Sequence, residues 1–377
     1  MAEPQRHIRA HTSLRGVAAT LVILYHLKFG AEYRFPFETA TRFFDRGYLW
    51  VDLFFILSGF VLSYVYVGDR PAAFSPAATR RYLVARFARV YPLHLATLLL
   101  LVAFQTALAA AYALAQGDSF FDHLTPRSIG QALVQVPLLQ TWGFYDDAGW
   151  NIPAWSISAE MHAYLLLPVI AAALAARRRT AQLILFAAPL AFYAALVAQG
   201  GSLDLTMRGG IARCLAGFFL GVLIFELRGV TKSWSERTLL VLQLAAAAGS
   251  LAAIAFVPVD AVVIPFFALL VLSTWEDRGA LARTLGAGPL QRLGDWSYAI
   301  YLLQVCVITI FGFFFYRLSD LLGLAAPVDR AAYMGAVLAI TIASGAIVYE
   351  KFEMPARRRL TARLGGRRAA RGAAGAD

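Results

Sequence analysis

The sequence has 377 residues, of which 59% are hydrophobic and only 15% are charged. Roughly a quarter of the residues in a typical soluble domain are charged, so this composition excludes an ordinary soluble protein. The net charge of +11 does not indicate a nucleic-acid-binding protein, because the basic residues separate apolar runs that recur along the whole chain. Only helices and closed barrels span a bilayer, and these runs lack the alternation of barrel strands. The composition therefore predicts an all-α, polytopic membrane protein.

The apolar runs define the predicted membrane helices. A span needs about 20 apolar residues, and by this measure the chain has about ten transmembrane helices, at 13–29, 47–67, 90–115, 151–175, 180–199, 209–227, 237–256, 259–275, 294–316 and 332–350. Two prolines interrupt the stretch 117–150, which predicts a long loop with a short amphipathic or re-entrant helix at 128–142. We expect one transmembrane domain over 1–356 and a disordered basic tail over 357–377.

The distribution of arginine predicts the orientation of the helices. Loops on one side hold most of the basic residues, whereas the other side has only Arg34, Arg42, Arg46, Arg127, Arg208, Arg317 and Arg330. Cytoplasmic loops carry the excess of basic residues in membrane proteins. Both termini are therefore expected in the cytoplasm.

The first predicted helix contains Arg15 and His26 within its apolar run. Ionisable side chains are costly within a bilayer and are candidates for function. Eleven residues make about three helical turns, so both side chains lie on one face, roughly 16 Å apart in depth. This face would present a cation near the cytoplasm and an imidazole in the outer half of the membrane. An arginine that extends to the interface and a histidine bonded to a neighbouring helix would explain the pair equally well.

The second and sixth predicted helices each contain one charged residue near the outer surface. Asp52 lies about a turn and a half inside the membrane, and Arg213 lies in the first turns of the helix at 209–227. Charges at such positions need a partner or a polar cavity. Ser58 and Gly59 are small residues, which favour close packing of helices.

The segment before the third apolar run is rich in arginine and includes Arg86 and Arg89. On a helix, residues three apart are neighbours on one face. Two adjacent guanidinium groups suit the bidentate recognition of phosphate. The alternative interpretation is the ordinary enrichment of arginine on the cytoplasmic side.

The fourth predicted helix contains Glu160, the deepest carboxylate of the chain. Ser156 and Tyr164 lie four residues before and after it and therefore share its helix face. His162 points elsewhere and is a weaker candidate. The two cysteines of the chain lie in apolar runs without metal-ligand spacing, so we expect no metal.

Taken in order, these motifs resemble the acyltransferase type 3 family of bacterial integral-membrane O-acyltransferases. The series is Arg15 and His26 with ten residues between them, Val-Asp-Leu-Phe-Phe-x-Leu-Ser-Gly-Phe at 51–60, Arg86-x-x-Arg89 with Tyr91-Pro92, Trp155-Ser156-x-Ser158-x-Glu160, Gly294-x-x-Ser297-Tyr298-x-x-Tyr301-Leu302, and Glu353-x-Pro355. No single motif is specific, but the ordered series covers almost the full length. The chain departs from many members at Trp50, where glycine is common, and at Gln304, where histidine is common. Glutamine cannot titrate, so no proton transfer is expected at 304.

The resemblance implies an enzyme of the bacterial cytoplasmic membrane. It would transfer an acyl group, most often acetyl, from cytoplasmic acyl-CoA to a hydroxyl of a surface glycan or another secreted acceptor. His26 would act as general base or transient acyl carrier, with Glu160 as the catalytic partner that orients it if their helices touch. The remaining site residues are Arg15, Arg86, Arg89, Ser297 and Tyr298 for the donor, and Asp52, Trp155, Ser156 and Arg213 for the acceptor.

Two other functions are compatible with buried ionisable residues. A transporter or flippase of a polar or anionic solute also has such residues along its path, although the sequence shows no internal repeat of the kind found in many transporters. A structural or sensory membrane protein would not need His26 and Glu160 within apolar helices. Consumption of acyl-CoA would identify the acyltransferase, because a transporter moves an unmodified solute.

Overall fold

The computed structural model describes residues 7–30, 40–68, 75–176, 179–323 and 326–365, and this part of the chain is helical without strands. The helices are α1 (Arg9–Gly30), α2 (Trp50–Tyr66), α3 (Pro76–Gln116), α4 (Phe120–His123), α5 (Pro126–Gln135), α6 (Ala154–Ala175), α7 (Arg179–Ala198), α8 (Gly210–Leu227), α9 (Glu236–Phe256), α10 (Val263–Thr274), α11 (Ala280–Leu285), α12 (Gly288–Asp295), α13 (Ser297–Leu322), α14 (Ala326–Val348) and α15 (Met354–Gly365). Short helical turns lie at Gly47–Leu49, Gln140–Trp142, Arg228–Ser233, Asp260–Val262 and Tyr349–Glu353.

Each predicted membrane segment overlaps a helix of the structure, which confirms the all-α fold class. In the described part of the chain, seven helical stretches are long and apolar enough to cross a bilayer, and two shorter apolar stretches correspond to α7 and α10. α1 is not among these stretches, because Arg15, His26 and Lys28 interrupt its apolar sequence. The count of ten and the cytoplasmic position of the termini stay predictions, since 1–6 and 366–377 lie outside the described residues.

α3 begins fourteen residues before the predicted apolar run. Ser75 caps its first turn by accepting a hydrogen bond from the backbone of Ala78 at 3.2 Å, and Pro76 occupies the first helical position. Hydropathy alone does not identify the first turns of this helix, because arginine favours helix formation but interrupts an apolar run. Arg86 and Arg89 therefore lie on one continuous helix with the membrane-spanning part of α3.

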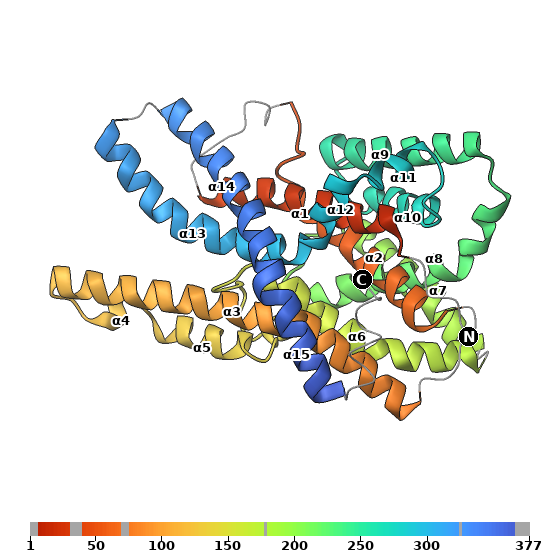
Figure 1. Cartoon of the computed structure of the whole chain (residues 1–377), viewed down its shortest axis with the longest axis horizontal. Coiled ribbons are helices and arrows are strands. Elements are labelled where there is room, and N and C mark those ends of the chain that lie inside the picture. Colours follow the sequence, from red (N-terminus) through yellow and green to blue (C-terminus); the bar gives the residue numbers. More distant parts are fainter. Residues whose placement is uncertain (1–6, 31–39, 69–74, 177–178, 324–325, 366–377) are drawn as a thin grey trace.

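The predicted tail begins as helix rather than as a disordered segment. α14 continues through a π-helical turn at Tyr349–Glu353 into α15, which covers 357–365. Figure 1 shows α15 crossing the N-terminal half of α3, and Arg357 and Thr361 are buried. The first part of the tail thus belongs to the folded domain, whereas 366–377 lie outside the described residues.

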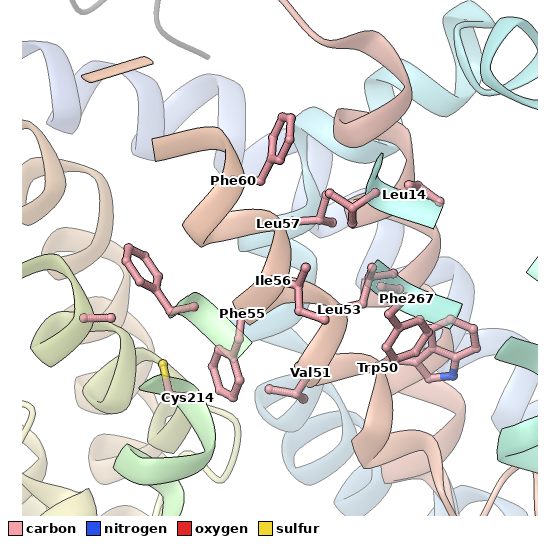
Figure 2. Packing of buried hydrophobic residues seen from close by; sticks show 14 of the residues in the cluster. Leu14, Trp50, Val51, Leu53, Phe55, Ile56, Leu57, Phe60, Cys214 and Phe267 are labelled. Carbon is pink, nitrogen blue, oxygen red and sulfur yellow. The ribbon is translucent and has the colours of Figure 1, made fainter. Parts of the chain in front are cut away.

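α2 lies at the centre of the molecule and buries side chains in several directions (Figure 2). Its closest neighbour is α8, and glycines allow the two backbones to touch. A Cβ atom built on Gly221 would lie 2.1 Å from the carbonyl oxygen of Ile56, and one on Gly59 would lie 2.0 Å from that of Phe218. Small residues at such crossings let membrane helices approach closely. The predicted packing role of Gly59 is confirmed.

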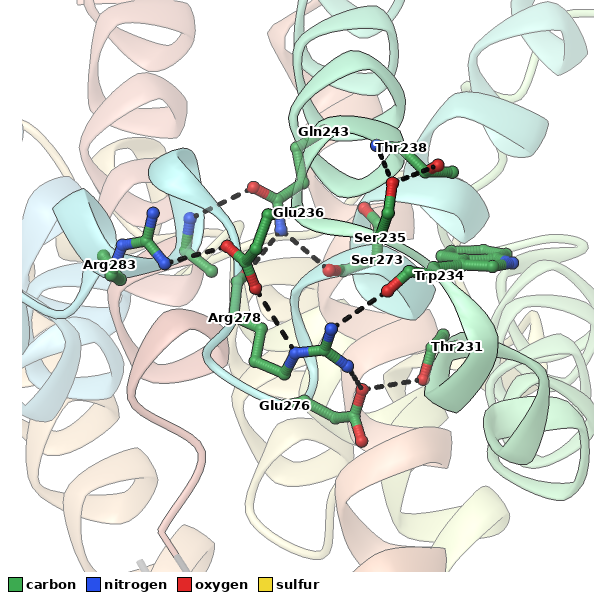
Figure 3. A network of polar contacts seen from close by, with 11 residues as sticks. Thr231, Trp234, Ser235, Glu236, Thr238, Gln243, Ser273, Glu276, Arg278 and Arg283 are labelled. Atoms are coloured by element: carbon green, nitrogen blue, oxygen red, sulfur yellow. Dashed lines mark hydrogen bonds and ion pairs between the residues drawn. The ribbon is translucent and has the colours of Figure 1, made fainter.

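A polar network joins the ends of α9 and α10 to the loop that follows them (Figure 3). Arg278 contacts Glu276 at 3.2 Å and Glu236 at 3.5 Å, and the amide of Gln243 donates to the carbonyls of Ser273 and Arg278. This loop leads to α11 and α12, which pack against α1. The network therefore helps to position the helix that bears Arg15 and His26.

The predicted orientation can be tested at the two ends of α3. We expect a cysteine replacing exposed Asp118 to react with a membrane-impermeant maleimide in intact cells, because this end is predicted to lie outside. A cysteine replacing exposed Ser75 should react only after permeabilisation. Both variants need a chain in which the buried Cys214 and Cys306 are replaced. Labelling at 75 in intact cells would overturn the orientation.

Candidate active site

The first cavity of interest, named the arginine cavity, lies between α1, α2, α3, α6 and α13. Its polar lining consists of Arg15, Ser58, Tyr66, Arg86, Arg89, Ser156, Glu160, Tyr164, Ser297, Tyr298 and Tyr301. All five residues assigned to the donor are among them. The structure thus brings together motifs that lie more than 280 residues apart in the sequence.

Glu160 projects into the arginine cavity from α6. Its carboxylate accepts hydrogen bonds from the hydroxyl of Ser58 at 2.6 Å and from the hydroxyl of Tyr164 at 2.8 Å. Arg15 and Arg86 are the cations that act on it electrostatically. The predicted shared face of Glu160 and Tyr164 is confirmed, but Ser58 is a ligand of the carboxylate and not only a packing residue.

Arg86 and Arg89 occupy different environments although both line the cavity. Arg89 forms an ion pair with Glu353, which is buried, and its guanidinium lies 5.4 Å from the centre of the Tyr298 ring. Arg86 donates to the hydroxyl of Tyr66 at 3.2 Å. The π-helical turn brings Glu353 to α3. The Glu353-x-Pro355 motif therefore helps to position Arg89 of the Arg86-x-x-Arg89 motif.

Two polar atoms at the arginine cavity are buried without a protein partner. Among the described residues, neither Nε of Arg86 nor Oγ of Ser297 has a hydrogen-bond partner. Buried donors are almost always satisfied in folded proteins. These atoms therefore point to a ligand that accepts hydrogen bonds inside the cavity.

A second cavity, named the His26 cavity, has a volume of about 380 Å³. Its lining includes His26 and Tyr25 of α1, Tyr48, Trp155 of α6, Asp147, Asp204 and Tyr301. Arg127 contacts Asp147 at 2.7 Å, and this hydrogen bond lowers the pKa of the Asp147 carboxyl. Most charged residues that line the arginine cavity are arginines, whereas Asp147 and Asp204 are the acidic residues that line the His26 cavity.

His26 is 92% buried at the edge of this cavity, since only 8% of its surface is exposed. Its Nδ1 lies 3.0 Å from the carbonyl oxygen of Val22. A carbonyl can only accept a hydrogen bond, so Nδ1 bears the proton of the neutral ring and Nε2 is the basic nitrogen. The side chain of Gln304 stands beside the ring.

The expected orientation of His26 by Glu160 does not match their positions. Glu160 lines the arginine cavity, whereas His26 lines the other one. The hydrogen bonds to the carboxylate come from Ser58 and Tyr164.

Tyr301 is the residue that separates the two cavities. It lines both of them, and its hydroxyl lies 2.8 Å from Oγ of Ser156, which faces the arginine cavity. The ring of Phe54 packs against the Tyr301 ring with 5.7 Å between centres. A molecule that connects the arginine residues with His26 must therefore pass Tyr301.

Asp52 and Arg213 form a fully buried ion pair that lines neither cavity. Arg213 donates to both carboxylate oxygens of Asp52, at 3.0 and 2.7 Å, and to the carbonyl of Tyr48 at 2.8 Å. Its guanidinium also lies 5.3 Å from the centre of the Trp155 ring. The sequence assigned this pair to the acceptor side. In the structure Arg213 contacts Tyr48 and Trp155, which line the His26 cavity.

Sequence reasoning missed four tyrosines, one serine and two aspartates of these cavities: Tyr25, Tyr48, Tyr66, Tyr301, Ser58, Asp147 and Asp204. Ser58 and Tyr301 stand inside the quoted motifs, and Tyr25 precedes His26, so the motifs contained a signal for them. Tyr48 and Tyr66 lie in the helical turn before α2 and at its end, where nothing in the local sequence indicates a cavity.

A cavity lined by arginines and a cavity lined by a buried imidazole share Tyr301, an arrangement that suits an enzyme embedded in a membrane. The comparison with protein families agrees: the acyltransferase domain matches residues 12–350. The chain belongs to this acyltransferase type 3 family and is a multi-pass membrane acyltransferase.

The chain is similar to one protein over most of its length and to another over part of its length. The chain is 28% identical to the acyltransferase MdmB of Streptomyces mycarofaciens over 395 residues, which covers 95% of this chain and 94% of that protein. It is 32% identical to Protein 2 in the picA locus of Rhizobium radiobacter over 168 residues, which covers 42% of this chain and 78% of that protein. No solved structure matched the chain.

Proposed function

We propose that this protein transfers an acyl group, in the simplest case acetyl, from cytoplasmic acyl-CoA to a hydroxyl of a surface glycan or another secreted acceptor. The donor would enter the arginine cavity, and the acceptor would enter the His26 cavity. The lipid bilayer would surround the apolar helices. The bacterial cytoplasmic membrane is the compartment that offers acyl-CoA on one side and secreted acceptors on the other.

The observation that supports the donor assignment most directly is the pair of unsatisfied donors, Nε of Arg86 and Oγ of Ser297. Coenzyme A presents phosphate and amide oxygens, which accept such hydrogen bonds. The arginine cavity has a volume of only about 130 Å³, below the roughly 300–1,000 Å³ of sites that enclose a whole ligand. The arginine cavity is therefore suited to the narrow pantetheine arm of coenzyme A, and the nucleotide would bind at the entrance of the cavity.

The chemistry we propose takes place beside Tyr301. The acceptor oxygen attacks the thioester carbonyl carbon while Nε2 of His26 takes the hydroxyl proton. The C–S bond then breaks, and the thiolate of coenzyme A recovers that proton from the imidazolium. In the alternative, Nε2 itself attacks the thioester carbon, and the C–S bond breaks with coenzyme A leaving as the thiolate. The acceptor hydroxyl then attacks the acyl-imidazole carbon, the N–acyl bond breaks, and the hydroxyl proton goes to the thiolate.

We assign Glu160 a positioning role on the donor side. Its carboxylate stands among the arginines and is held by Ser58 and Tyr164. There it attracts the side chains of Arg15 and Arg86 and holds them in place for the donor. Glu160→Gln should consequently weaken donor binding, and this effect distinguishes the role from orientation of His26.

Arg86→Ala should weaken the binding of acetyl-CoA by roughly 10- to 150-fold. A charge-assisted hydrogen bond to phosphate contributes about 1.5–3 kcal/mol, and each 1.4 kcal/mol is a factor of ten. Arg86→Lys should also lose affinity if the contact is bidentate. Isothermal titration of the purified protein in nanodiscs measures the constant. Arg89 is less suitable for this test, because its removal also breaks an ion pair with the buried Glu353.

Arg81→Ala is the matched control, since Arg81 lies on the same helix but is exposed and is absent from the cavity lining. Its affinity should stay near that of the wild type. Equal losses in the two variants would indicate attraction by general surface charge. Unchanged affinity in Arg86→Ala would remove the donor from the arginine cavity.

A further inference from the structure

The helix α5 reverses the burial pattern of a helix in a soluble protein. Its polar side chains Gln131 and Gln135 are buried, with only 7% and 1% of their surface exposed. Its apolar side chains Ile129 and Leu133 expose 39% and 68% of theirs. The two apolar residues lie four positions apart and share one face, and the two glutamines lie on the opposite side of the helix. A helix in water buries its apolar face against the protein, so the exposed face of α5 requires a medium other than water.

The polar face of α5 holds part of the wall of the His26 cavity. The side-chain amide of Gln131 donates a hydrogen bond to the carboxylate of Asp147. That of Gln135 donates to the carbonyl of Ala148. Both acceptor residues line the His26 cavity. The position of this wall is therefore coupled to the position of α5.

The surroundings of α5 indicate which medium covers its apolar face. Figure 1 shows α4 and α5 running along the C-terminal half of α3, and contacts join α3 to both helices. This half of α3 belongs to a stretch that is apolar enough to cross a bilayer, and it exposes Leu99, Leu100 and Leu114. α5 has ten residues, or roughly 15 Å, which is half of a hydrocarbon core of about 30 Å. It is too short to span a bilayer and fits within one leaflet.

We propose that α5 is an interfacial helix whose apolar face, Ile129 and Leu133, contacts the acyl chains of the leaflet nearest the His26 cavity. Helices of this kind lie in the plane of the membrane, with their apolar face at the boundary between headgroups and acyl chains. Arg127, in the first turn, is exposed and pairs with the exposed Asp147 at 2.7 Å, which suits the hydrated headgroup region. The partner of the apolar face is lipid, and the bilayer thereby holds the helix to which the cavity wall is bonded.

The depth of α5 can be measured with spin labels on the full chain in nanodiscs. Leu133→Cys is labelled in a chain in which Cys214 and Cys306 are replaced, and the collisions of the label with oxygen and with a water-soluble nickel chelate are compared. Oxygen concentrates in hydrocarbon, whereas the chelate stays in water. Leu99→Cys is the lipid standard and Asp118→Cys is the aqueous standard, because one side chain is exposed on α3 and the other just after its end.

We expect the ratio of oxygen to nickel collisions at 133 to lie within about twofold of the lipid standard and about tenfold above the aqueous standard. The replaced side chain is exposed, so the packing of α5 should persist, and a monodisperse gel-filtration peak verifies this. A ratio near the aqueous standard would overturn the proposal. Few collisions with either reagent would indicate that a second copy or another protein covers α5, and would overturn it as well. None of these outcomes involves acyl transfer, so the proposed function is tested separately.

Leu133→Asp tests whether lipid contact positions the cavity wall. A carboxylate is costly among acyl chains and draws this face toward water, so the hydrogen bonds from α5 to Asp147 and Ala148 should open more often. We expect amide hydrogen exchange over 147–151 to become about tenfold faster in nanodiscs. Leu114→Asp places the same charge on the exposed surface of α3 and should leave this exchange within about twofold of the wild type. Unchanged exchange in Leu133→Asp, or an equal rise in both variants, would contradict the role of lipid in holding the wall.

Discussion

His26→Ala should abolish acyl transfer while the protein still inserts, folds and binds acetyl-CoA. Removal of a general base lowers a rate by about 10²–10⁴-fold, and more if His26 carries the acyl group. Donor binding should survive, because the arginine cavity does not include His26. Turnover is measured per mole of folded protein that binds acetyl-CoA, with release of free coenzyme A as the readout.

His11→Ala is the matched control for this experiment. His11 lies on the same helix and is as deeply buried, but it hydrogen-bonds the carbonyl of Val271 at 3.0 Å and lines neither the arginine cavity nor the His26 cavity. Its loss should lower stability and leave turnover per folded molecule near the wild-type value. Turnover of His26→Ala within a few fold of wild type would exclude His26 from the mechanism.

Asp52→Ala should destabilise the protein by about 3–5 kcal/mol, the cost of leaving one partner of a buried ion pair without its counter-charge. Both side chains of the Asp52–Arg213 pair are fully buried. Loss of the pair also releases the backbone of Tyr48 and the ring of Trp155 from Arg213. The variant should therefore show a raised KM for the acceptor as well as a lower unfolding free energy in reversible detergent denaturation.

An exposed ion pair provides the comparison. Asp146 and Arg208 are 2.7 Å apart, but 72% and 75% of their side chains are exposed. Asp146→Ala should cost only about 0–1 kcal/mol, because water screens the pair. A double variant with Asp52→Ala and Arg213→Met should recover part of the loss, since it removes the unpaired charge. Similar unfolding free energies for Asp52→Ala and Asp146→Ala would contradict the structural role of the buried pair.

The sequence by itself determined where the helices lie along the chain and which residues share one face of a helix. Hydrophobic runs are local, so the ten predicted ranges coincide with helices of the structure. Helical periodicity is also local, which is why the common face of Glu160 and Tyr164 was predictable. The boundaries failed where arginine interrupts the apolar pattern, at the start of α3, and where a predicted tail packs as α15.

Only the tertiary structure decided which of these faces meet. The rotation and depth of each helix depend on contacts such as Gly59 against α8, which join segments far apart in the chain. Those contacts pair Asp52 with Arg213 and Arg89 with Glu353, and they place Glu160 and His26 in different cavities. No local pattern encodes the depth of one helix relative to another. The motif residues could therefore be selected from the sequence, whereas their division between the arginine cavity and the His26 cavity required the packed helices.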